Sequence, residues 1–224
     1  GAAVPIEIAA FAEKHASDRL ASLVARTAAT GARTVTVPHD ILAAISPVKN
    51  PTGAVAIARY STASLPAILG APSPLVLFLH GVQDPGNVGA VIRAAEACGA
   101  TGIVTSDGSA DPFGWKALRG AMGSSFRLPI AVHQDLAQAI AQARKAGIRI
   151  FATVPRGGTP LASSDLRKPC AVLLGGEGPG LPDELVRAAD ERLTIPMREP
   201  VESLNVATAA ALIVYEAARQ RSKR

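Results

Sequence analysis

Apolar and polar residues follow a rhythm along residues 75–220 that predicts strands and helices in turn. Short unbroken apolar runs, such as Leu75–Leu79 and Ala171–Leu174, are typical of strands in a parallel sheet covered on both faces. The predicted strands are Leu75–Leu79, Thr101–Thr105, Arg127–Ala131, Ile148–Thr153, Cys170–Leu174 and Arg192–Pro196. The predicted helices are Asn87–Cys98, Trp115–Met122, Asp135–Ala146, Pro182–Ala189 and Leu204–Gln220. This alternation predicts an α/β fold.

The first 60 residues show the same alternation on a smaller scale. The predicted elements are strand Val4–Ala10, helix Ser17–Ala29, strand Arg33–Val37, helix Asp40–Ile45 and, after a turn at 50–53, strand Ala54–Tyr60. Residues 61–74 contain three prolines and read as a linker, although a surface loop within one domain is the alternative. We therefore expect a small domain at 1–60, a linker at 61–74 and a larger domain at 75–224.

Composition narrows the class of protein. The chain has 224 residues, 48% of them hydrophobic, which is enough for a packed core and excludes a disordered polyelectrolyte. The net charge of +5 is compatible with an anionic partner such as nucleic acid, and equally with a merely soluble protein. Two cysteines, Cys98 and Cys170, cannot form a disulfide framework, and no metal-site spacing occurs. Without a signal peptide or an apolar run of about 20 residues, we expect a cytoplasmic protein and no membrane contact.

Three loops that follow predicted strands carry unusual residues, and the first leads into the helix predicted from Asn87. It reads His-Gly-Val-Gln-Asp-Pro-Gly-Asn over residues 80–87, and Arg93 follows within the helix. In parallel sheets, ligands bind at the carboxyl ends of strands, where such loops begin. We expect Asn87 to cap the helix, which directs its positive end at a ligand. A capped helix with a solvated Arg93 paired to Glu96 explains the same residues equally well.

The second loop, residues 175–181, reads Gly-Gly-Glu-Gly-Pro-Gly-Leu. Four glycines in six residues are unfavourable unless the backbone adopts unusual angles or approaches a ligand closely. Glu177 is the only charged residue in this loop. The loop matches neither the phosphate-binding loop nor the dinucleotide fingerprint, and an elaborate turn is the simpler alternative.

The third loop, residues 195–205, reads Ile-Pro-Met-Arg-Glu-Pro-Val-Glu-Ser-Leu-Asn and leads into the final helix. Ser203 stands where we expect the helix cap, but a cap explains one residue and not the whole polar loop. The final helix is apolar nearly all round from Val206 to Tyr215, which predicts burial against the fold or against another subunit.

In this order the three loops resemble the motifs of the SpoU family of RNA ribose 2′-O-methyltransferases, in the SPOUT superfamily. The resemblance covers about residues 75–220, and it is specific because three separate motifs match in order and spacing. The matching segments are Asn87-x-Gly89-x-x-x-Arg93, Gly175–Leu181, and Ile195-Pro196-Met197 through Ser203-Leu204-Asn205. Residues 1–60 resemble, less specifically, the later part of the L30e-like substrate-binding domain of that family. That domain normally begins with a further strand and helix, so we expect the chain to start partway into it.

The resemblance implies a deep trefoil knot in the parallel sheet domain, a homodimer, and S-adenosylmethionine as methyl donor with no metal. It implies that the backbone and apolar side chains of the knot loops bind this cofactor. The implied cofactor-binding residues are Thr153, Val154, Pro155, Leu174, Gly175, Gly176, Ile195, Pro196, Met197, Ser203 and Leu204. The implied catalytic and substrate-positioning residues are Asn87, Arg93, Glu177, Ser203 and Asn205.

An arginine at the position of Arg93 has been proposed as the base in this family. A guanidinium stays protonated to about pH 12, so we favour a cation that grips the target phosphate and stabilises the developing alkoxide. We expect Asn87 to orient the ribose or Arg93, and Glu177 to fix Arg93 or the loop.

Four arginines in or beside loops are candidates for RNA contacts, although each is also explained as a solvated surface residue. They are Arg119, Arg127, Arg156 and Arg198. The L30e-like unit resembles a ribosomal-protein RNA module, so large-subunit (23S) rRNA is expected ahead of tRNA as the substrate. Two other functions stay open: a knotted homologue that binds RNA or cofactor without catalysis, and an ordinary nucleotide-binding α/β enzyme, which the missing phosphate-loop fingerprints disfavour.

Overall fold

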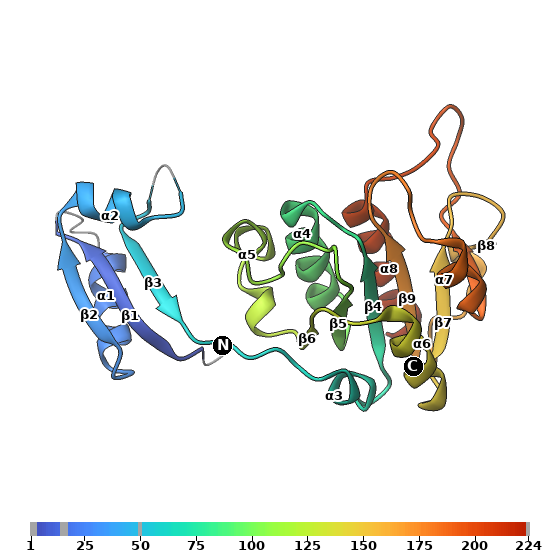
Figure 1. Ribbon diagram of the computed structural model, residues 1–224, viewed down its shortest axis with the longest axis horizontal. Coiled ribbons are helices and arrows are strands. Elements are labelled where there is room, and N and C mark those ends of the chain that lie inside the picture. Colours follow the sequence, from blue (N-terminus) through green and yellow to red (C-terminus); the bar gives the residue numbers. More distant parts are fainter. Residues whose placement is uncertain (1–3, 14–17, 49–50, 223–224) are drawn as a thin grey trace. The chain divides into compact units, whose positions relative to one another are not determined.

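The computed structural model describes residues 4–13, 18–48 and 51–222. The chain divides into two compact units, residues 1–61 and 62–224 (Figure 1). The expected start of the first helix at Ser17 and the turn residue Asn50 lie outside the described residues. None of the described helices is long and apolar enough to cross a membrane.

The first unit is a three-stranded sheet with one helix on each face. Its central strand pairs in parallel with β2 and antiparallel with β3. Successive side chains of a strand point to opposite faces, so Phe11 packs with Leu20 of one helix and Ala10 with Leu42 of the other. The elements are β1 (Ile6–Ala12), α1 (Asp18–Ala28), β2 (Arg33–Val37), α2 (His39–Ile45) and β3 (Ala54–Ala58). The predicted α/β order of this unit is confirmed, and its L30e-like character stays a prediction.

The second unit contains a seven-stranded sheet in the order β6-β5-β4-β9-β7-β10-β8, with every pairing parallel. Its strands are β4 (Leu75–His80), β5 (Gly102–Thr105), β6 (Ile130–Ala131), β7 (Arg149–Thr153), β8 (Thr159–Pro160), β9 (Cys170–Gly175) and β10 (Glu191–Thr194). Its α-helices are α3 (Leu65–Leu69), α4 (Pro85–Ala97), α5 (Trp115–Ala121), α6 (Leu136–Lys145), α7 (Asp183–Ala188) and α8 (Val206–Arg221). The predicted α/β fold with a parallel sheet is therefore confirmed, whereas the trefoil knot stays an expectation from the family.

Helices cover both faces of this sheet, which explains the unbroken apolar runs. Leu75, Leu77 and Leu79 of β4 are buried in one layer with α4, α5 and α8. Val76 and Phe78 of the same strand are buried in the opposite layer with α3, α6 and α7. A strand with no solvent-exposed face has no position at which a polar residue is favoured.

Residues 61–74 are not an extended linker, in contrast to the expectation. They contain α3, whose first turn is capped by the Ser64 hydroxyl, which accepts a hydrogen bond from the Ala67 N–H. Leu65, Ile68 and Leu69 are buried in the core of the second unit, so the boundary between units falls at residues 61 and 62. A serine two residues before a proline is a helix-start signal, and it outweighs the proline-rich composition here.

The predicted strand Arg127–Ala131 is also shorter than expected. Only Ile130–Ala131 pairs with β5, and a 3-10 turn occupies Ser124–Phe126. This turn follows Gly123, whose φ of +89° places the backbone in the left-handed region. The chain therefore turns before it joins the edge of the sheet.

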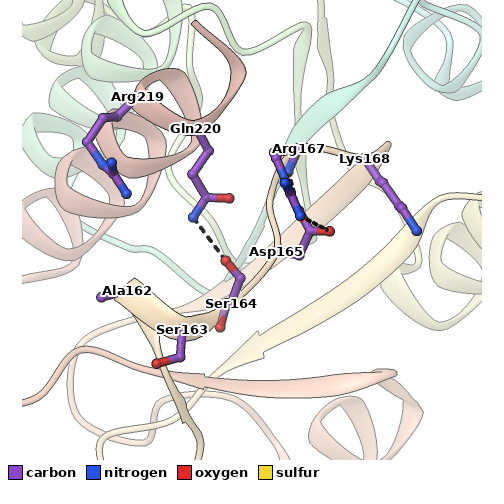
Figure 2. Close-up of a pocket in the computed structure, with 8 residues that line it drawn as sticks. All are labelled: Ala162, Ser163, Ser164, Asp165, Arg167, Lys168, Arg219 and Gln220. Carbon is purple, nitrogen blue, oxygen red and sulfur yellow. Dashed lines mark hydrogen bonds and ion pairs between the residues drawn. The ribbon is translucent and has the colours of Figure 1, made fainter. Parts of the chain in front are cut away.

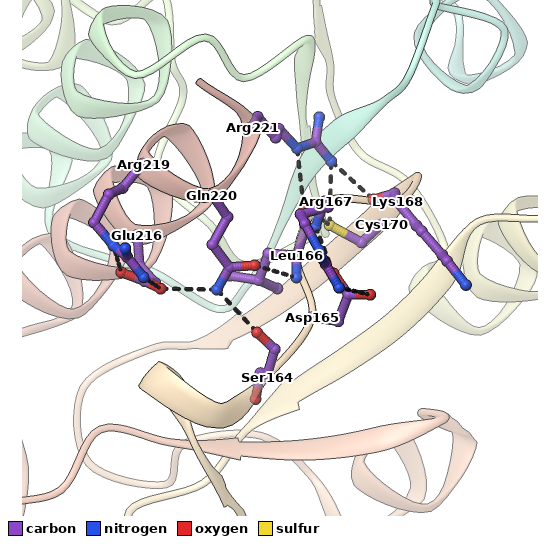
Figure 3. Close-up of polar contacts among 10 residues, drawn as sticks. All are labelled: Ser164, Asp165, Leu166, Arg167, Lys168, Cys170, Glu216, Arg219, Gln220 and Arg221. Atoms are coloured by element: carbon purple, nitrogen blue, oxygen red, sulfur yellow. Dashed lines mark hydrogen bonds and ion pairs between the residues drawn. The ribbon is translucent and has the colours of Figure 1, made fainter. Parts of the chain in front are cut away.

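The last turn of α8 is fastened to the edge of the sheet where β4 and β9 begin (Figure 3). The Arg221 guanidinium donates to the backbone oxygens of Ser73 (2.8 Å), Pro74 (3.1 Å), Leu166 (2.9 Å) and Lys168 (2.9 Å). These segments lie more than 50 residues away from Arg221 in sequence. One side chain thus joins the end of the chain to the starts of two central strands.

A groove of about 540 Å³ lies beside this fastening, with Lys168 and Arg219 on opposite sides of it (Figure 2). The Arg167 guanidinium pairs with Asp165 at 2.8 Å and holds the pKa of that carboxyl at about 2. Arg219 pairs with Glu216 at 2.7 Å. These two ion pairs compensate Arg167 and Arg219, so Lys168 is the remaining cation among the residues that line the groove.

Candidate active site

The three motif loops follow β4, β9 and β10, so they meet at the carboxyl edge of the sheet. The cap of the first helix differs from the expectation. The Asp84 carboxylate accepts the Asn87 backbone N–H at 2.8 Å, and Pro85 occupies the first turn of α4. Asp84 and not Asn87 is therefore the cap, and the Asn87 side chain is left for other contacts.

The cap of the final helix differs in the same way. The Asn205 side-chain oxygen accepts the backbone N–H groups of Ala207 (2.9 Å) and Thr208 (3.2 Å), so α8 starts at Val206. Ser203, the expected cap, lies on the exposed part of the preceding loop. Asn205 was expected as a site residue, and its capping role fixes the orientation of its amide.

A chain of two hydrogen bonds joins the three motifs. The Asn205 Nδ2 group donates to Asn87 Oδ1 at 3.1 Å, and the Asn87 Nδ2 group donates to Glu177 Oε1. Because the Asn205 oxygen is bound to the helix N-terminus, its nitrogen must face Asn87, which in turn directs its own nitrogen at the carboxylate. Asn87 therefore links the three motifs through its two hydrogen bonds. Glu177 is bonded to Asn87 rather than to Arg93.

The glycines of the second motif fall into two kinds. A Cβ at Gly175 would lie 2.3 Å from the Gly180 carbonyl carbon, and one at Gly176 would lie 2.0 Å from the Gly81 oxygen. Glycine is required at these two positions because neighbouring backbone segments, at Gly180 and Gly81, leave no space for a side chain. The approach of a ligand is not the only reason. Gly178 and Gly180 have positive φ values of 92° and 68°, with open space where a side chain would start.

The second and third motifs enclose a cavity of about 500 Å³, within the range of roughly 300–1,000 Å³ typical of small-molecule sites. Ten of the eleven expected cofactor residues line it: Thr153, Val154, Pro155, Leu174, Gly175, Gly176, Ile195, Met197, Ser203 and Leu204. Pro196 does not line it. Residues that were not expected also do so: Gly178, Pro179, Gly180, Leu181, Leu193, Val206 and Ala209.

The residues that line this cavity fit S-adenosylmethionine. Leu174, Ile195 and Met197 supply apolar walls suited to an adenine ring, and the open positions at Gly178 and Gly180 leave room at the backbone. Glu177 and Asn205 line the same cavity and supply polar atoms. In the described part of the chain, no group of three or more His, Cys, Asp or Glu side chains could hold a metal ion.

Arg93 is exposed on α4, one turn beyond Gly89. Within the described ranges it forms no hydrogen bond or ion pair, so the alternative explanation, in which Arg93 pairs with Glu96, does not hold. Glu96 instead binds Arg127 through two hydrogen bonds of 2.5 and 2.7 Å, and this contact lowers the pKa of the Glu96 carboxyl. The structure leaves the Arg93 guanidinium available to an external anion.

The arginines expected to contact RNA differ in how strongly the protein holds them. Arg127 is engaged by Glu96, and Arg156 lies 3.6 Å from Glu199 in an exposed pair. Among the described residues, Arg119 and Arg198 have no carboxylate partner. Arg119 lies 5.9 Å from the ring of Trp115, which is not among the expected site residues.

The fold and site together are those of a SpoU-type methyltransferase, and comparisons with known proteins agree. Residues 74–215 match the model of the SpoU rRNA Methylase family, so the chain belongs to that family.

Among its relatives is the 23S rRNA (guanosine(2553)-2′-O)-methyltransferase RlmP of Bacillus subtilis. It is 33% identical over 186 residues, which cover 83% of this chain and 73% of that protein. A 23S rRNA (guanosine-2′-O-)-methyltransferase RlmB of Burkholderia sp is 32% identical, over 92% of this chain and 85% of its own length. The solved structure of the SpoU methyltransferase AviRb from Streptomyces viridochromogenes, in complex with the cofactor AdoMet, superposes with a TM-score of 0.87. It is 27% identical, over 98% of this chain and 84% of that chain.

Proposed function

We propose that this protein transfers a methyl group from S-adenosylmethionine to a ribose 2′-hydroxyl of large-subunit (23S) rRNA. The observation that carries the proposal is the hydrogen-bonded chain Asn205–Asn87–Glu177, which joins all three motifs at the wall of a cavity suited to the cofactor. The family membership and the rRNA-directed names of the two relatives support the substrate class.

Bound S-adenosylmethionine supplies an electrophilic methyl group on a sulfonium sulfur. The residues that would hold it are those of the cavity wall, with Leu174, Ile195 and Met197 against the adenine. The carboxylate of Glu177 lies at the same wall and complements a positive charge there. Asn87, fixed between two partners, keeps this carboxylate in place.

The chemical difficulty is the loss of the weakly acidic 2′-proton. A guanidinium is a poor base, so the role of Arg93 is to bind the phosphate beside the target ribose and to stabilise the developing alkoxide. The free guanidinium on an exposed helix face supports this role. Ser203, an exposed residue that lines the cavity, is proposed to contact the ribose or the cofactor.

We also propose that the protein works as a homodimer in the cytoplasm. Exposed apolar side chains on α8, Leu212 at 42% and Tyr215 at 66% exposure, support a subunit contact there. The alternatives are a tRNA substrate and a knotted homologue without catalytic activity.

Calorimetry distinguishes the proposed methyltransferase from an ordinary nucleotide-binding α/β enzyme. S-adenosylmethionine should bind with one site per chain, and Gly178→Val, which places a branched residue at a positive-φ position in the cavity wall, should weaken binding. NAD is the control, because an ordinary dinucleotide-binding enzyme would bind it instead. Failure of the wild-type protein to bind S-adenosylmethionine would overturn the proposal.

A further inference from the structure

The exposed face of α5 carries an aromatic ring flanked by two cations. Lys116 Nζ lies 5.8 Å from the centre of the Trp115 ring, and the Arg119 guanidinium carbon lies 5.9 Å from it. Trp115 keeps 40% of its surface exposed, and both cations are exposed. Among the residues that the structure describes, neither cation forms a hydrogen bond or an ion pair. The face therefore presents two uncompensated positive charges next to a partly exposed aromatic ring.

The remainder of α5 is held rigidly against the helix that carries Arg93. A Cβ at Gly89 of α4 would lie 2.3 Å from the Ala117 oxygen, and a Cβ at Gly120 would lie 3.2 Å from the Gly86 oxygen. The two helices are thus in direct backbone contact. The segment after α5 is pinned as well, since the Ser125 hydroxyl donates to the Pro112 oxygen at 3.0 Å.

The place of this face relative to Arg93 follows from helix geometry. Residues four apart lie on the same face of a helix, so Arg93 projects from the side of α4 that Gly89 presents to α5. Trp115 and Arg119 lie on the side of α5 away from Ala117 and Gly120, about one helix diameter, roughly 10 Å, across. If RNA is held at Arg93, a nucleotide next to the target nucleotide, and not the target itself, therefore contacts α5.

We propose that Trp115, Lys116 and Arg119 form a platform on which this enzyme stacks an unpaired RNA base close to the nucleotide it methylates. The ring supplies a surface for one base, and the two cations bind the phosphates on either side. Charge complementarity selects RNA over a second copy of this chain, because a copy would bring the same two cations to the interface. The statement that the platform lies close to the methylated nucleotide rests on the proposed function. The test of RNA binding by the platform does not depend on it.

Trp115 is the only tryptophan of the chain, so its fluorescence reports on this face alone. Titration with a single-stranded 12-nucleotide oligouridine should quench the emission, and an RNA duplex of equal length should quench it less. Trp115→Ala should weaken oligouridine binding at least about fivefold, measured by anisotropy of a labelled oligonucleotide, whereas Trp115→Phe should retain most of the affinity. Lys116→Ala with Arg119→Ala should reduce the slope of log Kd against log salt by about 1.4.

Lys168→Ala is the matched control, because it removes an exposed cation at the opposite edge of the sheet and should leave both readouts unchanged. With rRNA as substrate, Trp115→Ala should raise KM and leave kcat near the wild-type value. Unquenched emission together with unchanged affinity of Trp115→Ala would overturn the platform, and so would a change of oligomeric state in that variant at unchanged RNA affinity. Quenching without methyl transfer by the wild type would instead support the platform and refute the proposed activity.

Discussion

Asn205 performs two tasks with two different atoms, and a pair of substitutions separates them. Its oxygen accepts two backbone N–H groups of α8, and its nitrogen donates to Asn87. Asn205→Asp keeps an oxygen for the cap and removes the donor. Asn205→Ala removes both.

The expected stability changes follow from the cap. Asn205→Ala should destabilise the protein by about 1 kcal/mol, the usual effect of losing a side-chain cap. For a chain of this size that corresponds to a fall in Tm of about 2–4 °C. Asn205→Asp should lower Tm less than Asn205→Ala, because it keeps the cap, and the favourable interaction of a carboxylate with the helix dipole offsets part of the lost hydrogen bond to Asn87.

The expected activity changes follow from the donor. With a carboxylate at 205, Asn87 has carboxylates on both sides and can direct its amide nitrogen at only one of them. The lost hydrogen bond is worth about 1 kcal/mol, and the added repulsion acts in the same direction, so kcat/KM should fall about tenfold or more. Thermal unfolding followed by circular dichroism and transfer of labelled methyl to 23S rRNA provide the two readouts. An Asn205→Asp enzyme with wild-type kcat/KM would refute the role of the chain of hydrogen bonds, and one as unstable as Asn205→Ala would refute the cap.

Five further substitutions test other parts of the structure. Arg93→Ala should reduce kcat/KM about 100- to 1,000-fold while calorimetric binding of S-adenosylmethionine stays near wild type, and near-normal turnover would contradict the assignment. Gly176→Ala should lower the free energy of unfolding by at least about 2 kcal/mol, because its Cβ meets a backbone oxygen. Gly178→Ala should lower the free energy of unfolding by only about 1 kcal/mol, because the position has a positive φ but open space around it. Equal losses of stability for Gly176→Ala and Gly178→Ala in urea unfolding would show that the backbone crossing at Gly176 is not tight. Arg221→Ala should cost about 2 kcal/mol by removing the guanidinium that donates to the Ser73 and Lys168 backbone oxygens, whereas Arg167→Ala, which removes an exposed ion pair, should change Tm little.

Residue patterns predicted the sheet well because strands that are buried on both faces appear in the sequence as unbroken apolar runs. The run Leu75–Leu79 is unbroken because its side chains enter two separate core layers. The motifs likewise predicted most of the cavity wall, because loops after parallel strands meet at one edge of the sheet. Pro196 is the exception among those residues, since its side chain does not reach the cavity.

The two helix caps were placed wrongly because several residues in each loop are able to cap. Asp84 precedes Pro85, and a proline in the first helical turn favours the residue before it as the cap over Asn87. Ser203 and Asn205 are both good caps, and only the packed helix decides between them. The pairing of Arg127 with Glu96 joins residues 31 positions apart, and no local pattern predicts it.

Trp115 was overlooked for a different reason. Aromatic residues make up only 4% of the chain, a content that gives no sign of a stacking surface. One tryptophan suffices when two cations lie beside it on a short helix. The spacing 115, 116 and 119 was a signal that could have identified this face from the sequence.

Methylation of 23S rRNA by this protein is tested most directly by a map of 2′-O-methyl groups on total RNA from cells with and without the gene. We expect that one methyl group of 23S rRNA disappears in the mutant, returns with the wild-type gene and does not return with Arg93→Ala. An unchanged map, or a loss confined to tRNA, would contradict it.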